Sequence, residues 1–172
     1  MSKIAITTMA LAGVLLSGSR LWGAGATNDV PWGEKINGVA LGVRPDRPVY
    51  GPADQVRVTV FVENFGGAAV RLLTTNSGEE RSLRLELFND DGTPARRTDL
   101  GRPANSPPYM PLPHVSHVVK TLESGDKLSV VVVLNDYFDL SHPGRYRLVV
   151  LRPALEGDFL VSNMASIDIT AK

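Results

Sequence analysis

The chain has 172 residues, of which 43% are hydrophobic and 21% charged, and its 18 basic side chains balance 18 acidic ones. This composition is typical of a globular domain and excludes a disordered or fibrous protein. A net charge of zero gives no electrostatic footprint for nucleic acid or for an anionic membrane. The absence of cysteine excludes disulfides, thiolate metal sites and cysteine nucleophiles.

Residues 1–26 have the pattern of a signal peptide. Lys3 precedes an uncharged, mostly apolar run over residues 4–16, and a segment rich in small residues then ends at Ala26. Small residues before the cut suit signal peptidase, and the apolar run is shorter than the roughly 20 residues of a membrane-spanning helix. We predict an exported protein, periplasmic or secreted, whose mature chain does not insert into a membrane. The alternative is that residues 1–26 form a buried first helix.

Alternation with a period of two residues dominates the chain after residue 35. In the segment Gln55–Glu63 four valines share one face, and Arg57, Thr59, Phe61 and Glu63 share the other, which predicts a strand with one buried face. Ser129–Leu134 is apolar at both odd-numbered and even-numbered positions, which predicts a central strand that is covered on both sides. The predicted strand segments are, in chain order, residues 39–43, 55–63, 83–87, 129–134, 146–150 and 167–169, and all but 129–134 alternate.

Turn sequences separate these segments, as in Asn64–Gly67 and Asn89–Gly92. Seven to eight short strands over about 140 residues predict an all-β, antiparallel sandwich of two sheets. We expect residues 27–35 to be an N-terminal extension and residues 36–172 to be the sandwich.

Tyr146 follows a Pro143-Gly144 turn at the start of an alternating strand. This arrangement resembles the tyrosine corner of immunoglobulin-like and fibronectin-type sandwiches, in which the phenol bonds to upstream backbone. The alternative is that Tyr146 is an ordinary core residue.

The order of short motifs resembles that of bacterial exported immunoglobulin-like domains over residues 31–170. The motifs are Trp32-Gly33-Glu34, Tyr50-Gly51-Pro52, Pro143-Gly144-Arg145-Tyr146 and Ser162-Asn163. More loosely, the chain is similar to the intracellular proteinase inhibitor family, through Val62-Glu63-Asn64, Ser77-Gly78 and Asp91-Gly92. The resemblance implies an immunoglobulin-like β-sandwich with structural roles for Trp32, Pro143, Gly144 and Tyr146. Such motifs consist of turns and core positions, so they carry little information about activity.

Residues with catalytic or metal-binding chemistry are few. His114 and His117 are three apart, which puts them on opposite faces of a strand and disfavours a shared metal. Asp90-Asp91-Gly92 lacks the alternating ligands of a calcium loop and indicates a hairpin turn. Asp136 and Asp139 form a carboxylate pair that could do acid–base work in a cleft, but they are better explained as turn caps. We therefore expect no enzyme, no metal and no cofactor.

The segment Gly101–Pro113 contains five prolines in 13 residues, which is uncommon for a connection inside a compact sandwich. Proline favours a stiff, extended backbone, so part of the entropy of ordering is already lost. Tyr109, Met110 and Leu112, together with Arg102, are therefore candidate binding residues. The alternative is that this Pro-rich loop folds back and caps one end of the sandwich.

These observations favour an exported, non-enzymatic immunoglobulin-like binding or accessory domain that recognises a protein partner through its end loops. A proteinase inhibitor that uses the Pro-rich loop is the alternative. An enzyme that uses Asp136, Asp139 or the histidines is a third hypothesis.

Overall fold

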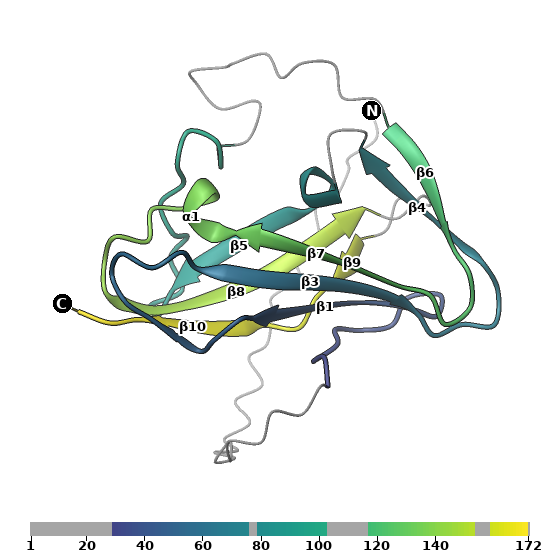
Figure 1. Ribbon diagram of the computed structural model, residues 1–172, viewed down its shortest axis with the longest axis horizontal. Helices are drawn as coiled ribbons and strands as arrows, with labels where there is room; N and C mark the ends of the chain where they lie inside the picture. The colour runs from purple at the N-terminus through teal and green to yellow at the C-terminus, as the bar shows by residue number, and fades with distance from the viewer. Residues whose placement is uncertain (1–28, 76–78, 103–116, 154–158, 172) are drawn as a thin grey trace, which may run out of the picture.

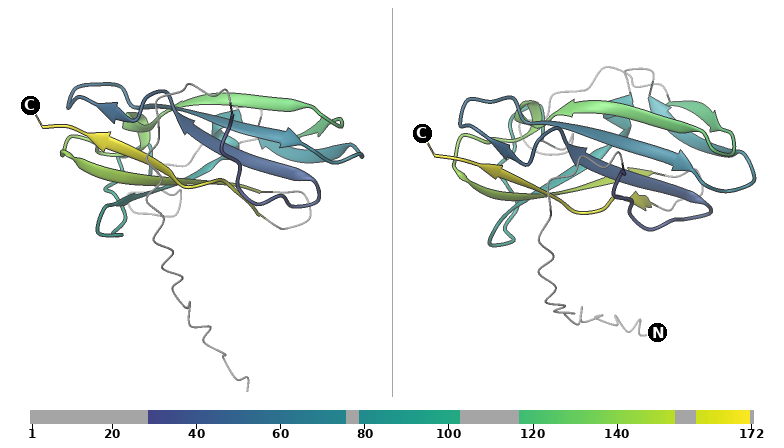
Figure 2. Two further views of the ribbon diagram at one scale, coloured as in Figure 1. Left: turned by 90° about the horizontal axis from the view of Figure 1, so that it is seen from below. Right: turned by 60° about the horizontal axis from the view of Figure 1, so that its bottom comes forward.

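A computed structural model describes residues 29–75, 79–102, 117–153 and 159–171 of the chain (Figure 1). The predicted signal peptide and most of the Pro-rich loop lie outside these residues. The described residues form two facing layers of β-sheet, which is a β-sandwich (Figure 2). Most of its neighbouring strands run antiparallel.

The first layer contains three antiparallel strands in the order β1-β3-β7. They are β1 (Val39–Pro45), β3 (Arg57–Asn64) and β7 (Lys127–Val133). Val60 in the central strand lies opposite Val43 of β1 and Val130 of β7. The valine alternation that predicts a strand over residues 55–63 therefore fixes the middle of this layer.

The second layer contains five strands and is built around β8, the longest strand. The order is β2-β10-β8-β5, with β9 paired to the far end of β8. The β2–β10 pair is parallel, and the other pairs between described strands are antiparallel. The strands are β2 (Val49–Tyr50), β5 (Arg84–Asn89), β8 (Gly144–Pro153), β9 (Phe159–Val161) and β10 (Ala165–Ile169).

A bent ribbon extends the first layer. β4 (Val70–Thr75) pairs antiparallel with β6 (His117–Leu122), and its register is shifted by two residues from that of β3 and β7 across a break after Asn64. Figure 1 shows that this ribbon turns back from the end of β3 and β7. A short 3-10 helix, η1 (Glu79–Ser82), follows β4, and the one-turn helix α1 (Leu134–Tyr137) follows β7.

Apolar side chains of both layers meet between the sheets. Val56, Val58, Val60 and Val62 are buried, and so are the inward residues of β8 from Tyr146 to Val150. This burial follows from strand geometry, because alternate side chains point to one face.

Each of the six predicted strand segments overlaps a strand, namely β1, β3, β5, β7, β8 and β10. The described residues contain ten strands rather than the predicted seven to eight. Two of the additional strands, β2 and β9, have two and three residues, and strands this short show no period in a sequence.

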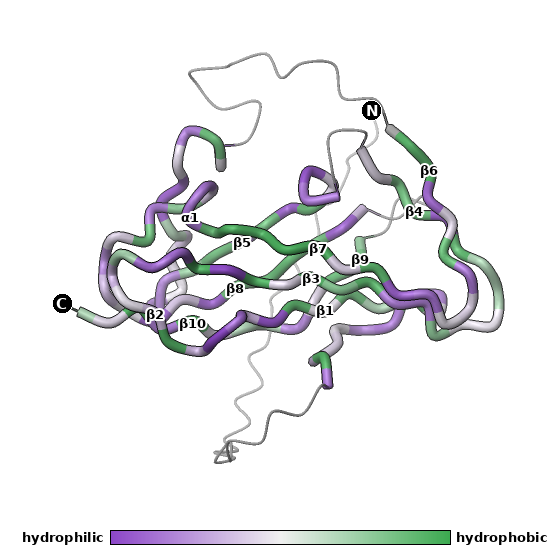
Figure 3. Tube along the Cα trace, in the orientation of Figure 1, coloured by the Kyte–Doolittle hydropathy of each residue, from purple (hydrophilic) through white to green (hydrophobic). Residues whose placement is uncertain are grey.

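The prediction that Ser129–Leu134 is a central strand is wrong. Among the residues that the structure describes, β7 is the edge strand of its sheet, and Val131 on its outer face is 42% exposed. Figure 3 shows the apolar stretch along this strand. Consecutive valines favour a strand because their side chains are β-branched. Such a run does not distinguish a strand buried on both faces from an apolar edge strand.

Phe61 is a second exception to simple alternation. It belongs to the outer face of β3, which the alternation leaves to solvent, yet it is only 9% exposed because Trp32 packs against it. Residues 30–36 lie on β1 through bridges from Trp32 to Gly42 and from Ile36 to Val39. In the structure, most of the predicted N-terminal extension is therefore attached to the sandwich.

Candidate functional site

A cleft of about 540 Å³ opens at one end of the sandwich. One wall is formed by residues 96–99 and Arg102, which follow β5. The other wall is formed by residues 138–141, which follow α1, and Asn135 and Pro52 complete the lining. The cleft therefore lies between two loops that are about 40 residues apart in the sequence.

Backbone hydrogen bonds hold the two loops together. Arg97 and Phe138 form an isolated antiparallel β-bridge, and the backbone amide of Asp139 donates to the carbonyl of Arg96 at 2.8 Å. The amide of Thr98 donates to the carbonyl of Tyr137 at 3.0 Å. The walls are thus fixed to each other by backbone pairing rather than by side chains alone.

Gly101 is required where the first loop meets α1. It is buried, and a Cβ atom at this position would lie 1.9 Å from the carbonyl oxygen of Tyr137. Such a distance is a steric clash, so glycine allows the close approach of the two backbones. The start of the Pro-rich loop is therefore anchored at the cleft.

The turn at Asn89–Thr93, which precedes the first wall of the cleft, has the hydrogen bonds expected of the predicted turn. Gly92 has a φ of 85°, which favours glycine, and its amide donates to the carbonyl of Asn89 at 3.0 Å. The Asp91 carboxylate accepts a hydrogen bond from the amide of Thr93 at 2.8 Å, which closes the turn. The hairpin-turn interpretation of Asp90-Asp91-Gly92 is confirmed.

Three arginines line the cleft, and they differ in how firmly other groups hold their side chains. Arg97 is held by the carbonyls of Leu85 and Gly101, by Glu86 and by the ring of Phe138, so its role is structural. The side chain of Arg96 is 83% exposed and lies 3.9 Å from Asp139, at the limit of an ion pair.

Arg102 is the other accessible cation of the cleft. It contacts Asp99 at 3.1 Å, and the Asp99 side chain is almost fully exposed. Pairs of exposed charges contribute little energy and exchange readily with other partners. Arg96 and Arg102 can therefore turn toward an anionic group that enters the cleft.

Asp139 caps the turn that forms the second wall. Its carboxylate accepts hydrogen bonds from the side-chain hydroxyl of Ser141 at 2.6 Å and from the Ser141 amide at 3.2 Å, and these bonds lower its pKa. The role of turn cap predicted for Asp139 is thus observed. The carbonyl of Asp136 accepts a hydrogen bond from the hydroxyl of Thr98.

Of the predicted binding residues, Arg102 lies in the cleft. Tyr109, Met110 and Leu112 lie outside the described residues, as does His114. Asp139, which the sequence singled out as a turn cap, also lines the cleft. The sequence did not reveal Arg96 or the neighbours of Asp139 in the loop 138–141, because their proximity depends on pairing between distant loops.

The predicted structural residues lie in the sandwich itself. The hydroxyl of Tyr146 donates a hydrogen bond to the carbonyl of His142 at 2.8 Å, which is the contact expected of a tyrosine corner. Pro143 lies in the exposed turn between these two residues, and Gly144 begins β8. Burial and the nearby charge of Asp139 raise the pKa of the Tyr146 phenol above its ordinary value.

We expect Tyr146→Phe to lower the free energy of unfolding by about 1 kcal/mol, the usual net value of one hydrogen bond. The ring stays in the core, and only the bond to the carbonyl of His142 is lost. Urea denaturation of the two proteins measures the difference. An unchanged midpoint would show that the corner adds nothing to stability.

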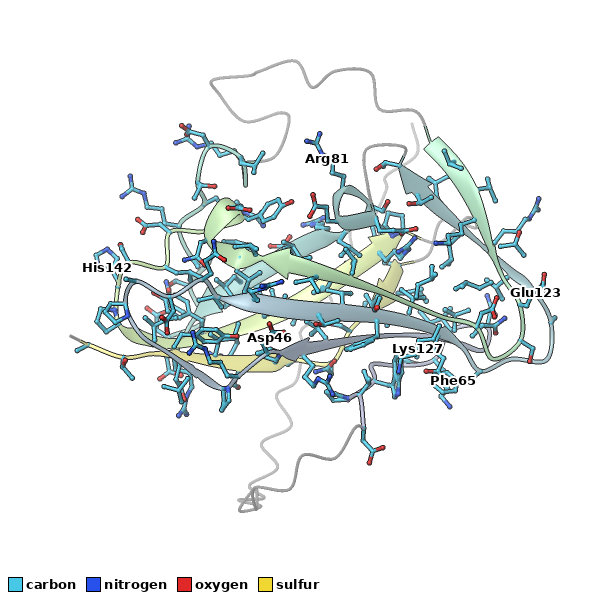
Figure 4. The ribbon with its side chains drawn as sticks, viewed as in Figure 1. Asp46, Phe65, Arg81, Glu123, Lys127 and His142 are labelled. Atoms are coloured by element: carbon cyan, nitrogen blue, oxygen red, sulfur yellow. The ribbon has the colours of Figure 1, made fainter. Side chains whose placement is uncertain are left out.

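An aromatic cluster lies on the outer face of β1 and β3, away from the cleft. Trp32 contacts Phe61 and Phe65 edge-on, with ring centroids 6.4 and 5.2 Å apart. Lys127 lies over the rings of Trp32 and Phe61, and Lys35 lies over Phe65. Figure 4 shows Phe65 and Lys127 together, with His142 at the opposite end of the molecule. Trp32 therefore has a packing role.

Among the described residues, no group of three His, Asp or Glu side chains could hold a metal ion. The helices of the same part of the chain are all too short to cross a membrane.

No family model and no curated protein matches this chain. The chain is similar in structure to the CARDB domain of the PF1109 protein from Pyrococcus furiosus, with 12% identity over 77% of this chain and 87% of that one, and a TM-score of 0.40. It is also similar to the sporulation control protein Spo0M from Bacillus subtilis, with 13% identity over 80% of this chain and 51% of that one, and a TM-score of 0.45. A third similar structure is the β-glucosidase EmGH1 from Erythrobacter marinus, with 15% identity over 77% of this chain and 15% of that one, and a TM-score of 0.40.

Proposed function

We propose that the protein is an exported, non-enzymatic immunoglobulin-like domain that binds a protein partner through the loops at its cleft end. The signal-peptide pattern of residues 1–26 supports export. The sandwich with its tyrosine corner supports the immunoglobulin-like assignment.

The cleft with its two exposed arginines is the observation that carries this proposal. Arg96 and Arg102 project from loops that are fixed to each other by backbone hydrogen bonds. Because the backbone of both loops is already fixed, only the two side chains lose freedom on binding, and guanidinium groups match carboxylates in a bidentate geometry. The partner is therefore a protein that presents an acidic segment or a terminal carboxylate.

Replacing both exposed arginines, Arg96→Ser with Arg102→Ser, is expected to weaken binding of the partner by at least about tenfold, because each charge-assisted bond adds about 1 kcal/mol or more. The partner is first isolated on the immobilised protein from the envelope fraction of the source cells and identified. Its affinity for each variant is then measured by titration calorimetry.

The matched control is Arg71→Ser, which removes an exposed arginine on β4. This control should bind as the wild type does, and binding to the wild type should weaken with added salt. Tyr109→Ser with Met110→Ser tests the Pro-rich loop in the same assay. Equal affinity of the arginine variant and the wild type would place the binding surface elsewhere.

A further inference from the structure

The asparagines of the chain differ in how their side-chain amides are held. The structure describes five of them, and hydrogen bonds hold the side-chain amides of four, namely Asn64, Asn89, Asn135 and Asn163. The fifth, Asn37, is exposed, and its side chain has no hydrogen-bond partner in the described part of the chain. It is also the only asparagine of the sequence that a glycine follows. Asn37 is therefore the asparagine most open to chemical change.

Asn37 and Gly38 form the turn of a tight hairpin. The amide of Ile36 donates to the carbonyl of Val39, and the amide of Val39 donates to the carbonyl of Ile36, both at 2.9 Å. Asn37 has a φ of 51° and Gly38 a φ of 83°, as a type I′ turn requires. Among the described residues, Asn37 is the one non-glycine residue with a positive φ. The turn joins residues 30–36, which we call the N-terminal arm, to β1 (Figure 1).

The backbone nitrogen of Gly38 is a nucleophile next to the side chain of Asn37. Once this nitrogen has lost its proton to the solvent, it attacks the carbon Cγ of Asn37 and closes a five-membered imide ring. The bond from Cγ to Nδ2 breaks, and Nδ2 takes a proton from the solvent and leaves as ammonia. Glycine hinders this attack least because it has no Cβ atom. Water then opens the ring at either carbonyl and gives aspartate or isoaspartate, so one water is consumed for each ammonia released.

The closed turn opposes this reaction. Ring closure requires rotation about the Cα–C bond of Asn37, and the two hydrogen bonds between Ile36 and Val39 fix that bond in the turn conformation. The reaction therefore starts from molecules in which the N-terminal arm has opened locally, as edge segments of folded proteins do.

A small set of contacts keeps the N-terminal arm closed. The amide of Gly33 donates to the carbonyl of Leu41 at 2.9 Å, and Trp32 forms a bridge with Gly42. The ring of Trp32 packs edge-on against Phe61, with centroids 6.4 Å apart. These contacts set how often the turn at Asn37 opens.

We propose that Asn37 is a site of spontaneous deamidation, and that isoaspartate formed there detaches the N-terminal arm from β1. Aspartate has the shape of asparagine and also suits a type I′ turn. Isoaspartate adds a CH₂ group to the main chain, so Ile36 and Val39 no longer lie opposite each other. The arm then loses its register, and Trp32 leaves Phe61. This inference concerns a different surface from the cleft and does not depend on the proposed function.

The test incubates the purified protein at mildly alkaline pH, which favours loss of the amide proton, and follows each asparagine by peptide mapping with mass spectrometry. The peptide with Asn37 should convert before the peptides with the four hydrogen-bonded asparagines. Asn37→Gly is the matched control, because glycine keeps the positive φ of the turn and has no side-chain amide. A peptide with Asn37 that stays unchanged while another described asparagine converts overturns the proposal.

Trp32→Ala tests whether opening of the N-terminal arm sets the rate. Loss of the aromatic contacts should make the arm open about ten times more often, and deamidation of Asn37 should accelerate by the same factor. Val118→Ala, which shortens an exposed valine on β6, should leave the rate unchanged. Circular dichroism checks that both variants are folded. Equal rates in the wild type and a folded Trp32→Ala variant would show that the arm does not control the reaction.

Amide hydrogen exchange tests the release of the N-terminal arm. After incubation, the amides of Gly33 and Val39 should exchange faster in the isoaspartate form than in fresh protein, because their acceptors are displaced. The same amides should keep their protection in the aspartate form and in incubated Asn37→Gly. Equal protection in the isoaspartate form and in fresh protein would mean that the arm stays on β1, and the proposal would then be wrong.

Discussion

Replacing Asn64 by alanine is expected to lower the free energy of unfolding by about 3 kcal/mol, because four hydrogen bonds are lost and the buried carbonyl of Leu122 is left without this donor. Its side chain is fully buried at the break between β3 and β4. The amide nitrogen Nδ2 donates to the carbonyls of Ala68, Leu122 and Glu123, at 2.8, 3.0 and 3.2 Å. The oxygen Oδ1 accepts a hydrogen bond from the amide of Gly66 at 2.9 Å. One side chain thus joins the bend of β3–β4 to the bend of β6–β7.

Urea denaturation followed by circular dichroism measures this loss. Asn89→Ala is the matched control, because the Asn89 amide bonds only Thr93 in an exposed turn, and the expected loss there is below about 1 kcal/mol. Asn64→Asp keeps the shape but replaces the donor by a carboxylate that faces carbonyl oxygens. At pH 7, Asn64→Asp should lower the free energy of unfolding at least as much as Asn64→Ala does. Similar midpoints for Asn64→Ala and Asn89→Ala would contradict this account of the bend.

Glu79→Gln is expected to destabilise the protein by about 2 kcal/mol, because it removes the charge that compensates a buried arginine. Arg152 on β8 is 1% exposed, and its nitrogen Nη2 lies 2.9 Å from the carboxylate of Glu79 and 3.4 Å from the carbonyl of Leu73. Its Nε has no hydrogen-bond partner in the described part of the chain. The double variant Glu79→Gln with Arg152→Met should recover to within about 1 kcal/mol of the wild type, since the buried cation is gone. Additive losses in the double variant would exclude this coupling.

The ion pair of Glu79 and Arg152 also makes the stability of the protein depend on pH. Burial raises the pKa of Glu79, but the charge and hydrogen bond of Arg152, helped by Lys120, outweigh burial and hold the pKa below its usual value of 4.5. A carboxyl with a lowered pKa in the folded state stabilises the protein above its unfolded pKa and loses this effect as the pH falls. The wild type should therefore lose stability below about pH 4.5 more steeply than Glu79→Gln. Urea midpoints between pH 6 and pH 3 measure the difference, and parallel curves would contradict it.

The sequence predicts the strands of the sandwich well because burial of one face leaves a local period of two residues. The valines of β3 and the leucines of β5 are examples. The same period passes through Arg152, which is in phase with Tyr146, Leu148 and Val150, but its charge argues against burial. Only the position of Glu79, more than 70 residues away, explains how this arginine is accommodated.

Contacts between distant segments cannot be predicted in this way. The cleft requires the loop after β5 to pair with the loop after α1, and neither loop has a periodic pattern. Arg102 is predicted only because it lies within the proline-rich segment that starts at Gly101, whereas Arg96 has no such signal. The aromatic cluster is likewise missed, because Trp32, Phe61 and Lys127 come from three separate parts of the chain.

The amide of Asn163 also bears on the order in which the protein folds. It bonds both the amide and the carbonyl of Val43, a residue that precedes it by 120 positions. Contacts at such long range form slowly, and here an early strand acquires its final neighbour only when the last tenth of the chain is present. A nascent polypeptide that lacks this segment has neither these two hydrogen bonds at the edge of β1 nor β10 beside β8, so both layers gain their last contacts only near the end of synthesis.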